Sequence, residues 1–224
     1  MYFKAVIFDL DGTLLDTLFD LKNAVNYTLS AHGYKERTLE EIKNAIGNGI
    51  RNLVKKSLPF DVQDNDPLVD ECTLEMKNYY FDNCTNDTCI YDGISDVLTF
   101  LNENNILASV LSNKADFLTK KIILHYFDDY FKFVYGERDG LPRKPDPTSV
   151  LLLAEEMGVM PPEILFVGDS ASDILVAKNA GMVSLGVSWG YRDKKELVAA
   201  GADFVADAPD DIINFISTYK PQII

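Results

Sequence analysis

Two carboxylates follow a short apolar run near the N-terminus. Asp9 and Asp11 lie in Asp9-Leu10-Asp11-Gly12-Thr13, directly after Ala5-Val6-Ile7-Phe8. A short β-rich run that ends in acids and a glycine predicts a buried strand with charge at its C-terminal end. Open α/β sheets bind their ligands at that end. There one carboxylate could attack a phosphorus atom while the other transfers protons, although the Asp-Gly pair alone is also typical of a plain turn.

Three further polar segments accompany later predicted strands. Ser112-Asn113-Lys114 follows a strand that ends at 111, and Arg143-Lys144-Pro145-Asp146-Pro147 precedes a strand at 164–167. That strand ends in Gly168-Asp169-Ser170, with Asp173 further on. Each segment alone is as typical of a turn or a helix cap. Their order on parallel strand ends, which open on one crevice, favours a single site.

The residue types in these segments suit phosphate ester hydrolysis through a covalent aspartyl-phosphate. A hydroxyl and backbone N–H groups can hold phosphoryl oxygens, and a lysine supplies positive charge. Asp9, Asp11 and Asp169 bring about three negative charges, which Lys144 alone cannot balance. Mg²⁺ prefers such oxygen ligands, so the sequence predicts Mg²⁺ as the cofactor.

In this order the segments resemble the haloacid dehalogenase-like hydrolases, whose pattern is DxDGT, a strand-terminal Ser or Thr, a Lys, and GDxxxD. The resemblance implies that Asp9 is the nucleophile and that Asp11 protonates the leaving group and then deprotonates water. It implies Mg²⁺ ligands from Asp9, the Asp11 carbonyl and Asp169, with Asp173 as a ligand or an orienting acid. The phosphate-binding set that we predict is Ser112, Asn113, Lys144, Gly12, Thr13 and Arg51.

Among the subfamilies, the chain is most similar to the phosphoglycolate phosphatases, so we expect a small phosphorylated metabolite as substrate. β-Phosphoglucomutase-like mutases share the four motifs, and pyrophosphatase, nucleotidase and phosphonate-cleaving activities also stay open. A receiver-type signalling domain is the alternative outside enzymes. Receivers are about half this length and lack an acid at the position of Asp11, which can drive hydrolysis of the aspartyl-phosphate.

Strands alternate with helices from residue 91 onward, whereas 15–88 reads as helices without a strong strand pattern. This alternation predicts right-handed βαβ units and a parallel sheet. We therefore expect an α/β, doubly wound, Rossmann-like core formed by 1–14 and 89–224. A small all-helical cap, 15–88, is inserted after the first strand.

Within the predicted cap, Gly47-Asn48-Gly49 could be a loop that closes over the substrate. Arg51 beside it is a candidate clamp for a carboxylate or a phosphate. A plain turn with an exposed arginine is an equally good interpretation. Lys55 and Lys56 are the candidates for a Schiff-base lysine of a phosphonate-cleaving relative, although we expect them to face solvent.

The net charge of −14 over 224 residues argues against binding to nucleic acid or an anionic membrane surface. No secretory or membrane-spanning pattern is recognised, so we expect a cytoplasmic protein, monomeric or homodimeric. Cys72, Cys84 and Cys89 have no paired spacing, which predicts reduced thiols.

Overall fold

A six-stranded parallel sheet forms the centre of the molecule, in the order β5-β4-β1-β6-β7-β8. The computed structural model describes residues 1–47, 49–59, 62, 66–128 and 130–221. The sheet strands are β1 (Ala5–Phe8), β4 (Leu107–Ala115), β5 (Phe133–Glu137), β6 (Ile164–Gly168), β7 (Val183–Val187) and β8 (Phe204–Ala206). From β1 the chain builds outward through β4 and β5, then returns to β6 on the other side of β1. This reversal of strand order makes the carboxyl end of β1 the switch point at which such sheets bind ligands.

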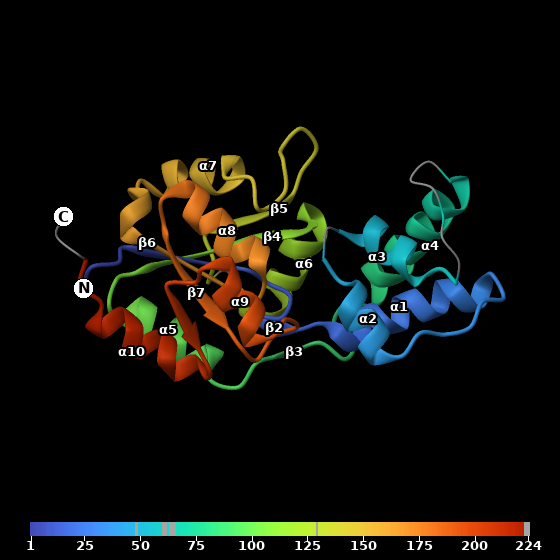
Figure 1. Cartoon of the computed structure of the whole chain (residues 1–224), viewed down its shortest axis with the longest axis horizontal. Coiled ribbons are helices and arrows are strands. Elements are labelled where there is room, and N and C mark those ends of the chain that lie inside the picture. The colour runs from blue at the N-terminus through green and yellow to red at the C-terminus, as the bar shows by residue number, and fades with distance from the viewer. Residues whose placement is uncertain (48, 60–61, 63–65, 129, 222–224) are drawn as a thin grey trace.

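Helices cover both faces of the sheet (Figure 1). One face carries α5 (Ile94–Glu103), α6 (Asp116–Phe127) and α10 (Pro209–Thr218), and the other carries α7 (Thr148–Met157) and α8 (Ala171–Ala180). The 3-10 turn η1 (Pro161–Glu163) leads into β6, and α9 (Lys194–Ala200) lies against β7 and β8. The side chains of β1 alternate accordingly: Val6 and Phe8 pack with the first group, Ala5 and Ile7 with the second. The predicted doubly wound α/β core is therefore confirmed.

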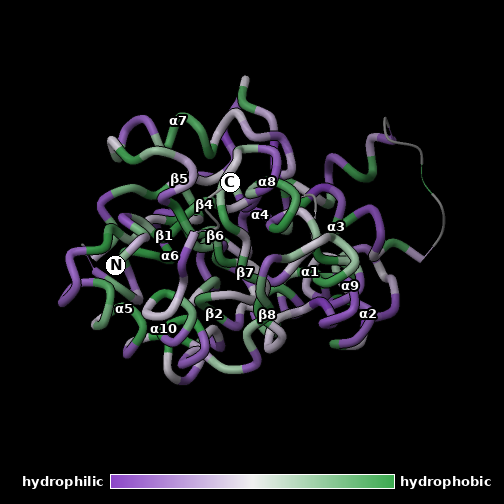
Figure 2. Tube along the Cα trace, turned by 60° about the vertical axis from the view of Figure 1, so that its left-hand side comes forward, coloured by the Kyte–Doolittle hydropathy of each residue, from purple (hydrophilic) through white to green (hydrophobic). Residues whose placement is uncertain are grey.

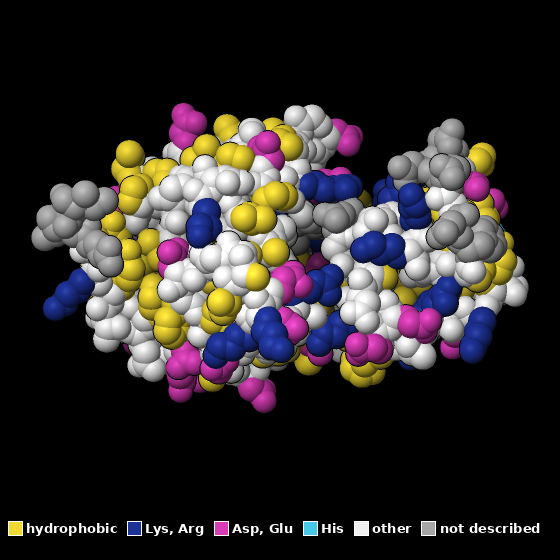
Figure 3. Space-filling view, in the orientation of Figure 1, with side chains coloured by type: hydrophobic (Ala, Val, Ile, Leu, Met, Phe, Trp, Pro, Cys, Tyr) yellow, Lys and Arg dark blue, Asp and Glu magenta, His cyan; other side chains and the backbone are white. Residues whose placement is uncertain are grey.

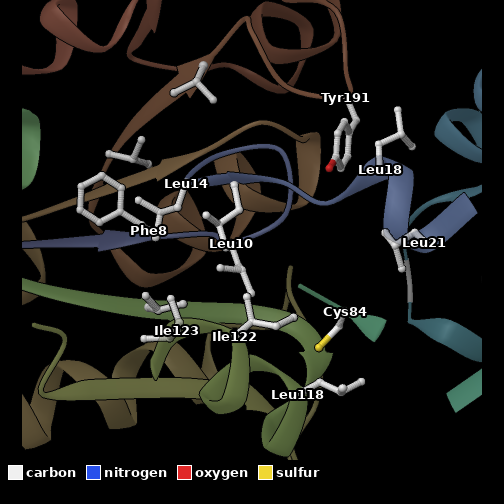
Figure 4. Close-up of a cluster of buried hydrophobic side chains, with 14 of the residues drawn as sticks. Phe8, Leu10, Leu14, Leu18, Leu21, Cys84, Leu118, Ile122, Ile123 and Tyr191 are labelled. Atoms are coloured by element: carbon white, nitrogen blue, oxygen red, sulfur yellow. The ribbon is translucent and has the colours of Figure 1, made fainter. Parts of the chain in front are cut away.

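An apolar cluster supports the loop that follows β1 (Figure 4). Leu10 and Leu14 are fully buried on either side of Asp11, and pack in one cluster with Phe8 and with Ile122 of α6. Burying a leucine of this kind stabilises the fold by about 1.5–3 kcal/mol. The backbone that carries the two acidic residues is thus held by its apolar neighbours.

Four helices form a lobe beside the sheet (Figure 1). They are α1 (Leu18–Ala31), α2 (Leu39–Ala45), α3 (Ile50–Ser57) and α4 (Pro67–Asn83). A capping box of Thr38 and Glu41 opens α2, and Asp66 caps α4 ahead of a proline at its first position. Apolar stripes on α1, α3 and α4 supply the buried centre of this lobe.

A short antiparallel ribbon joins the two parts of the molecule, and the sequence patterns missed it. It pairs β2 (Leu15–Asp16) with β3 (Cys89–Ile90). The expectation that 15–88 lacks strands is wrong at this ribbon, because two-residue strands have no detectable periodicity. The buried Asp20 carboxylate accepts hydrogen bonds from the backbone and hydroxyl of Thr88, which fixes the two crossing segments beside each other. The boundaries between core and cap at 14/15 and 88/89 stay a prediction. They assign β2 to the cap and its partner β3 to the core.

Hydrophobic residues concentrate along the central strands, and hydrophilic residues lie over the outer turns (Figure 2). No helix within the described ranges has the length and apolarity that crossing a membrane requires. Cys72 and Cys84 are buried and Cys89 is exposed, all three as unbridged thiols.

Candidate active site

A cavity of 260 Å³ lies at the carboxyl ends of the central strands, between the sheet and the helical lobe. Figure 3 shows Lys and Arg side chains gathered where these two parts meet. The sheet side of the cavity contributes Asp9, Asp11, Ser112, Asn113, Lys114, Lys144 and Asp169. The lobe contributes Leu21, Ile46, Gly47, Gly49, Ile50, Leu53 and Lys56. Polar and charged side chains of the core thus face a mostly apolar set of side chains from the lobe across the cavity.

Lys144 links two of the predicted acids. Its ammonium lies 2.9 Å from Asp9 Oδ1 and 2.6 Å from Asp173 Oδ1, and it donates to the Leu111 carbonyl at 3.1 Å. Burial alone would lower the pKa of this lysine, but Asp173 and Asp9 raise it above its ordinary value. Lys144 is therefore a permanent positive charge inside the site.

Asp9 sits at the end of β1, where its N–H donates to the Val167 carbonyl of β6. Burial raises the pKa of the Asp9 carboxyl to about 6, and Lys144 opposes that rise. Asp169 ends β6, and its Oδ2 accepts the Tyr191 N–H at 2.6 Å. Burial, followed by the charges of Asp173 and Asp9, raises the pKa of Asp169 well above its usual range. Both shifts arise mainly from burial, and the neighbouring carboxylates add to them, so Lys144 alone does not offset the cost of charging these acids.

One carboxylate oxygen from each of Asp9, Asp169 and Asp173 lies within 4.8 Å of the others. Such oxygen donors fit a divalent cation, which would compensate the remaining negative charge. Both oxygens of Asp173 already have partners, since Oδ1 contacts Lys144 and Oδ2 accepts from the Ser170 N–H and hydroxyl. Asp9 and Asp169 are consequently the better available donors.

Gly12 shows why the loop after β1 needs a glycine. Its φ is +80°, and a Cβ there would meet Asp169 Oδ2 at 2.3 Å. Neither Gly12 nor Thr13 lines the cavity, and the Thr13 side chain is fully buried. Their predicted phosphate binding therefore has no side-chain basis, although their part in shaping the loop is clear.

Asp11 has a partner that the sequence patterns did not single out. Its Oδ1 accepts hydrogen bonds from Thr17 Oγ1 at 2.6 Å and from Lys114 Nζ at 2.5 Å. Lys114 also donates to the Tyr80 hydroxyl at 2.9 Å. In the sequence Ser112-Asn113-Lys114 resembles an ordinary strand-to-helix turn, and nothing local points Lys114 toward Asp11.

Ser112 and Asn113 both reach the cavity. Ser112 is buried, and its Oγ accepts the Lys114 N–H at 3.2 Å, so the hydroxyl proton can be offered to a ligand. The Asn113 amide exchanges two hydrogen bonds with the Lys144 backbone. Asn113 thus holds the Lys144 loop in place, and its contact with phosphate stays a prediction.

Arg143 and Arg192, two arginines from the α/β part of the molecule, lie against the segment between α2 and α3. Arg192 donates to the Lys43 carbonyl at 2.9 Å and to the Ile46 carbonyl at 2.5 Å, at the C-terminal end of α2. A Cβ on Gly49 would meet the Arg143 guanidinium at 2.9 Å. Asn48, the middle residue of the predicted loop, lies outside the described residues.

Two of the three cap cations considered from the sequence, Arg51 and Lys56, are placed differently. Arg51 does not line the cavity, and its Nε lies 2.9 Å from Asp70 Oδ1 on the lobe surface. Its predicted role as a clamp gains no support from this position. Lys56 is exposed, as expected, and it also lines the cavity.

The doubly wound core carries Asp9 and Asp11 at one strand end, Asp169 at another, and the buried Lys144 beside them. This arrangement is typical of a class of hydrolases that act on phosphate groups. Comparison with known proteins agrees. The family model described as haloacid dehalogenase-like hydrolase matches residues 6–187, and the chain belongs to that family. Its curated relatives are phosphatases, and the chain is a phosphatase of this family.

Two relatives show how far the similarity extends. Phosphoglycolate phosphatase from Vibrio vulnificus is 32% identical over 219 residues, which cover 95% of this chain and 96% of that protein. The enzyme of the same name from Pseudomonas fluorescens is 33% identical, over 91% of this chain and 76% of its own length. The solved structure of a provisionally assigned phosphoglycolate phosphatase from Lactobacillus delbrueckii subsp. bulgaricus superposes with a TM-score of 0.87. It is 31% identical and covers 96% of this chain and 99% of that one.

Proposed function

We propose that this phosphatase depends on Mg²⁺ and hydrolyses a small phosphorylated metabolite through an aspartyl-phosphate on Asp9. One observation carries the proposal: Asp9 lies at the end of β1 against the buried ammonium of Lys144, in a cavity that Asp11 also lines. A carboxylate beside a fixed cation is suited to attack a phosphorus atom whose oxygens are negatively charged.

In the first step of the proposed reaction, an Asp9 oxygen bonds to phosphorus while the bond from phosphorus to the leaving oxygen breaks. Asp11 donates its proton to that leaving oxygen. The Ser112 hydroxyl and Lys144 hold phosphoryl oxygens as charge shifts onto them. In the second step Asp11 removes a proton from water, which attacks phosphorus and releases Asp9 and inorganic phosphate.

The residues that would hold Mg²⁺ are Asp9, Asp169 and the backbone carbonyl of Asp11. When bound, the ion would supply positive charge against the phosphoryl oxygens and the buried acids. Asp173 would act by orienting Lys144 and Ser170, consistent with the partners of both its oxygens. The resemblance alone left Asp173 open as a ligand.

We further propose that 15–88 is a cap that closes the site and selects the substrate, with the protein acting in the cytoplasm as a monomer or homodimer. The apolar lobe wall of Leu21, Ile50 and Leu53 would exclude water from the reacting atoms. A cavity of 260 Å³ suits a compact substrate. Because the curated relatives are phosphoglycolate phosphatases, 2-phosphoglycolate is the first substrate to test.

The deciding experiment is a phosphate-release screen over phosphorylated metabolites, with Mg²⁺ and with chelator, using Asp9→Asn as the matched control. We expect release that requires both Mg²⁺ and Asp9, with the highest kcat/KM on a small phosphorylated acid. Interconversion of hexose phosphates without phosphate release would instead favour the mutase alternative. Preferred release from pyrophosphate or nucleotides would redirect the substrate assignment.

A further inference from the structure

Lys114 is buried next to the reacting groups, and the proposed reaction assigns it no part. It lies in β4, two residues after Ser112, and its side chain is 3% exposed. Its ammonium contacts Asp11 Oδ1 at 2.5 Å and the Tyr80 hydroxyl at 2.9 Å. A buried ammonium costs several kcal/mol unless such partners compensate it. These contacts therefore determine where the side chain sits.

The two oxygens of the Asp11 carboxylate have different surroundings. Oδ1 accepts from both Lys114 and Thr17. Oδ2 has no hydrogen-bond donor among the residues that the structure describes, and Asp11 lines the cavity. One oxygen is thus anchored by the protein, and the other is left to meet a ligand.

Tyr80 carries this arrangement into the helical lobe. It belongs to α4 and is fully buried, with the centre of its ring 5.0 Å from the Lys114 ammonium. Burial raises the pKa of the Tyr80 hydroxyl well above its ordinary value, so it meets Lys114 as a neutral acceptor. The anchor of Asp11 therefore depends on a residue from the lobe as well as on the core.

We propose that Lys114 is a positioning residue, which holds Asp11 by Oδ1 so that Oδ2 faces the leaving-group oxygen, and that Tyr80 secures Lys114 from the lobe. The inference rests on the proposed function, in which Asp11 gives its proton to that oxygen while the bond from Asp9 to phosphorus forms. Without Lys114 only Thr17 would hold Oδ1, so the carboxylate would be less well fixed and proton donation would suffer more than phosphoryl binding.

Leaving-group dependence separates positioning from a general structural role. An alkyl phosphate such as 2-phosphoglycolate needs a proton on its leaving oxygen, whereas p-nitrophenyl phosphate releases a stable anion. We therefore expect Lys114→Met to lower kcat/KM for the alkyl phosphate about 30-fold more than for the aryl one. This is less than the roughly 10²–10⁴-fold that general acid catalysis contributes, because Asp11 itself is still present. Tyr80→Phe should act in the same direction, by about fivefold for one lost hydrogen bond.

Two variants make the comparison decisive. Lys121→Met is the matched control, because Lys121 of α6 also contacts α4, through Phe81, but lies away from Asp11; its alkyl-to-aryl ratio should stay at the wild-type value. Asp11→Asn is the reference for complete loss of the acid. If Asp11→Asn shows no leaving-group dependence, the proposed function is wrong about its acid.

Suppose that Asp11→Asn shows that dependence but Lys114→Met lowers kcat/KM equally for the alkyl and the aryl phosphate. Then the positioning role alone is overturned. Circular dichroism checks that Lys114→Met folds. Should it not fold, Tyr80→Phe decides: a shifted alkyl-to-aryl ratio supports the inference, and an unchanged ratio overturns it.

Discussion

The Lys144 ammonium lies 2.6 Å from Asp173 Oδ1, and the two side chains are 2% and 0% exposed. The same ammonium reaches Asp9 at 2.9 Å. One buried cation thus balances part of the charge of a buried acidic cluster. Removing one partner from a buried pair leaves an uncompensated charge, which is far more costly than losing a surface pair.

Lys144→Met should therefore lower the free energy of unfolding of the metal-free protein by about 3–5 kcal/mol. Lys194→Met is the matched control, because Lys194 and Asp207 form an exposed pair and such pairs contribute at most about 1 kcal/mol. Urea titration measures both values. Equal effects of the two substitutions would show that Lys144 is not needed to balance the buried acids.

Mg²⁺ should stabilise the protein more at pH 8 than at pH 5. Burial raises the pKa of Asp9 to about 6 and that of Asp169 well above its usual range. Folding thus favours their protonated forms. The contribution of Asp9 to the free energy of unfolding is therefore highest at low pH, where its carboxyl is protonated, and it falls as pH rises through about 6. Mg²⁺ competes with those protons, so its benefit grows in the same direction.

Thermal denaturation of chelator-treated protein, with and without Mg²⁺ at several pH values, measures this effect. At a concentration 100 times the Kd, a ligand adds about 2.7 kcal/mol, and Asp169→Asn should reduce that gain. A Mg²⁺ shift that is the same at pH 5 and pH 8 would contradict the assigned ligands.

Lys56, rather than Arg51, should set the affinity for a negatively charged leaving group. Lys114, Lys144 and Arg192 also line the cavity, but protein atoms engage each of them. Lys56→Met should raise KM for 2-phosphoglycolate about fivefold, the value of one exposed ion pair, with little effect on p-nitrophenyl phosphate. Arg51→Met is the matched control. A larger KM change for Arg51→Met would restore the interpretation drawn from the sequence.

Arg192→Met should loosen the contact between core and lobe, because Arg192 donates to the Lys43 and Ile46 carbonyls. Hydrogen bonds to a charged group contribute about 1.5–3 kcal/mol, so kcat/KM should fall about tenfold. Backbone amides at the end of α2 should exchange with deuterium faster. A lysine at this position cannot donate to both carbonyls at once, so Arg192→Lys should give kcat/KM and amide exchange between those of the wild type and Arg192→Met. Unchanged amide exchange would show that Arg192 does not hold the lobe.

Much of the core could be predicted because its signals are local. Apolar runs that lead into Asp9, Ser112 and Asp169 predict both the strands of the sheet and the residues of the site, although β4 continues past Ser112 to Ala115. The parallel sheet follows from alternation with helices. The same patterns missed β2 and β3, because a two-residue strand is defined by its partner and not by its own sequence.

The residues around Asp11 were missed for a different reason. Lys114 and Tyr80 are 103 and 69 residues away from Asp11 in sequence, and each is locally explained, one by a turn and one by the apolar face of a helix. Only tertiary packing brings them together. Arg51 and Lys56 illustrate the converse: helix spacing alone could not decide which of them lines the cavity.

Trapping the covalent phosphate tests the central claim most directly. Asp11→Asn should slow hydrolysis of the intermediate, so this variant is mixed with Mg²⁺ and substrate, quenched in acid and analysed by mass spectrometry. We expect a peptide containing Asp9 to gain the mass of one phosphoryl group and to lose it with hydroxylamine, which cleaves acyl phosphates. A phosphoryl group on another residue, or none while the wild-type enzyme turns over, would contradict the account.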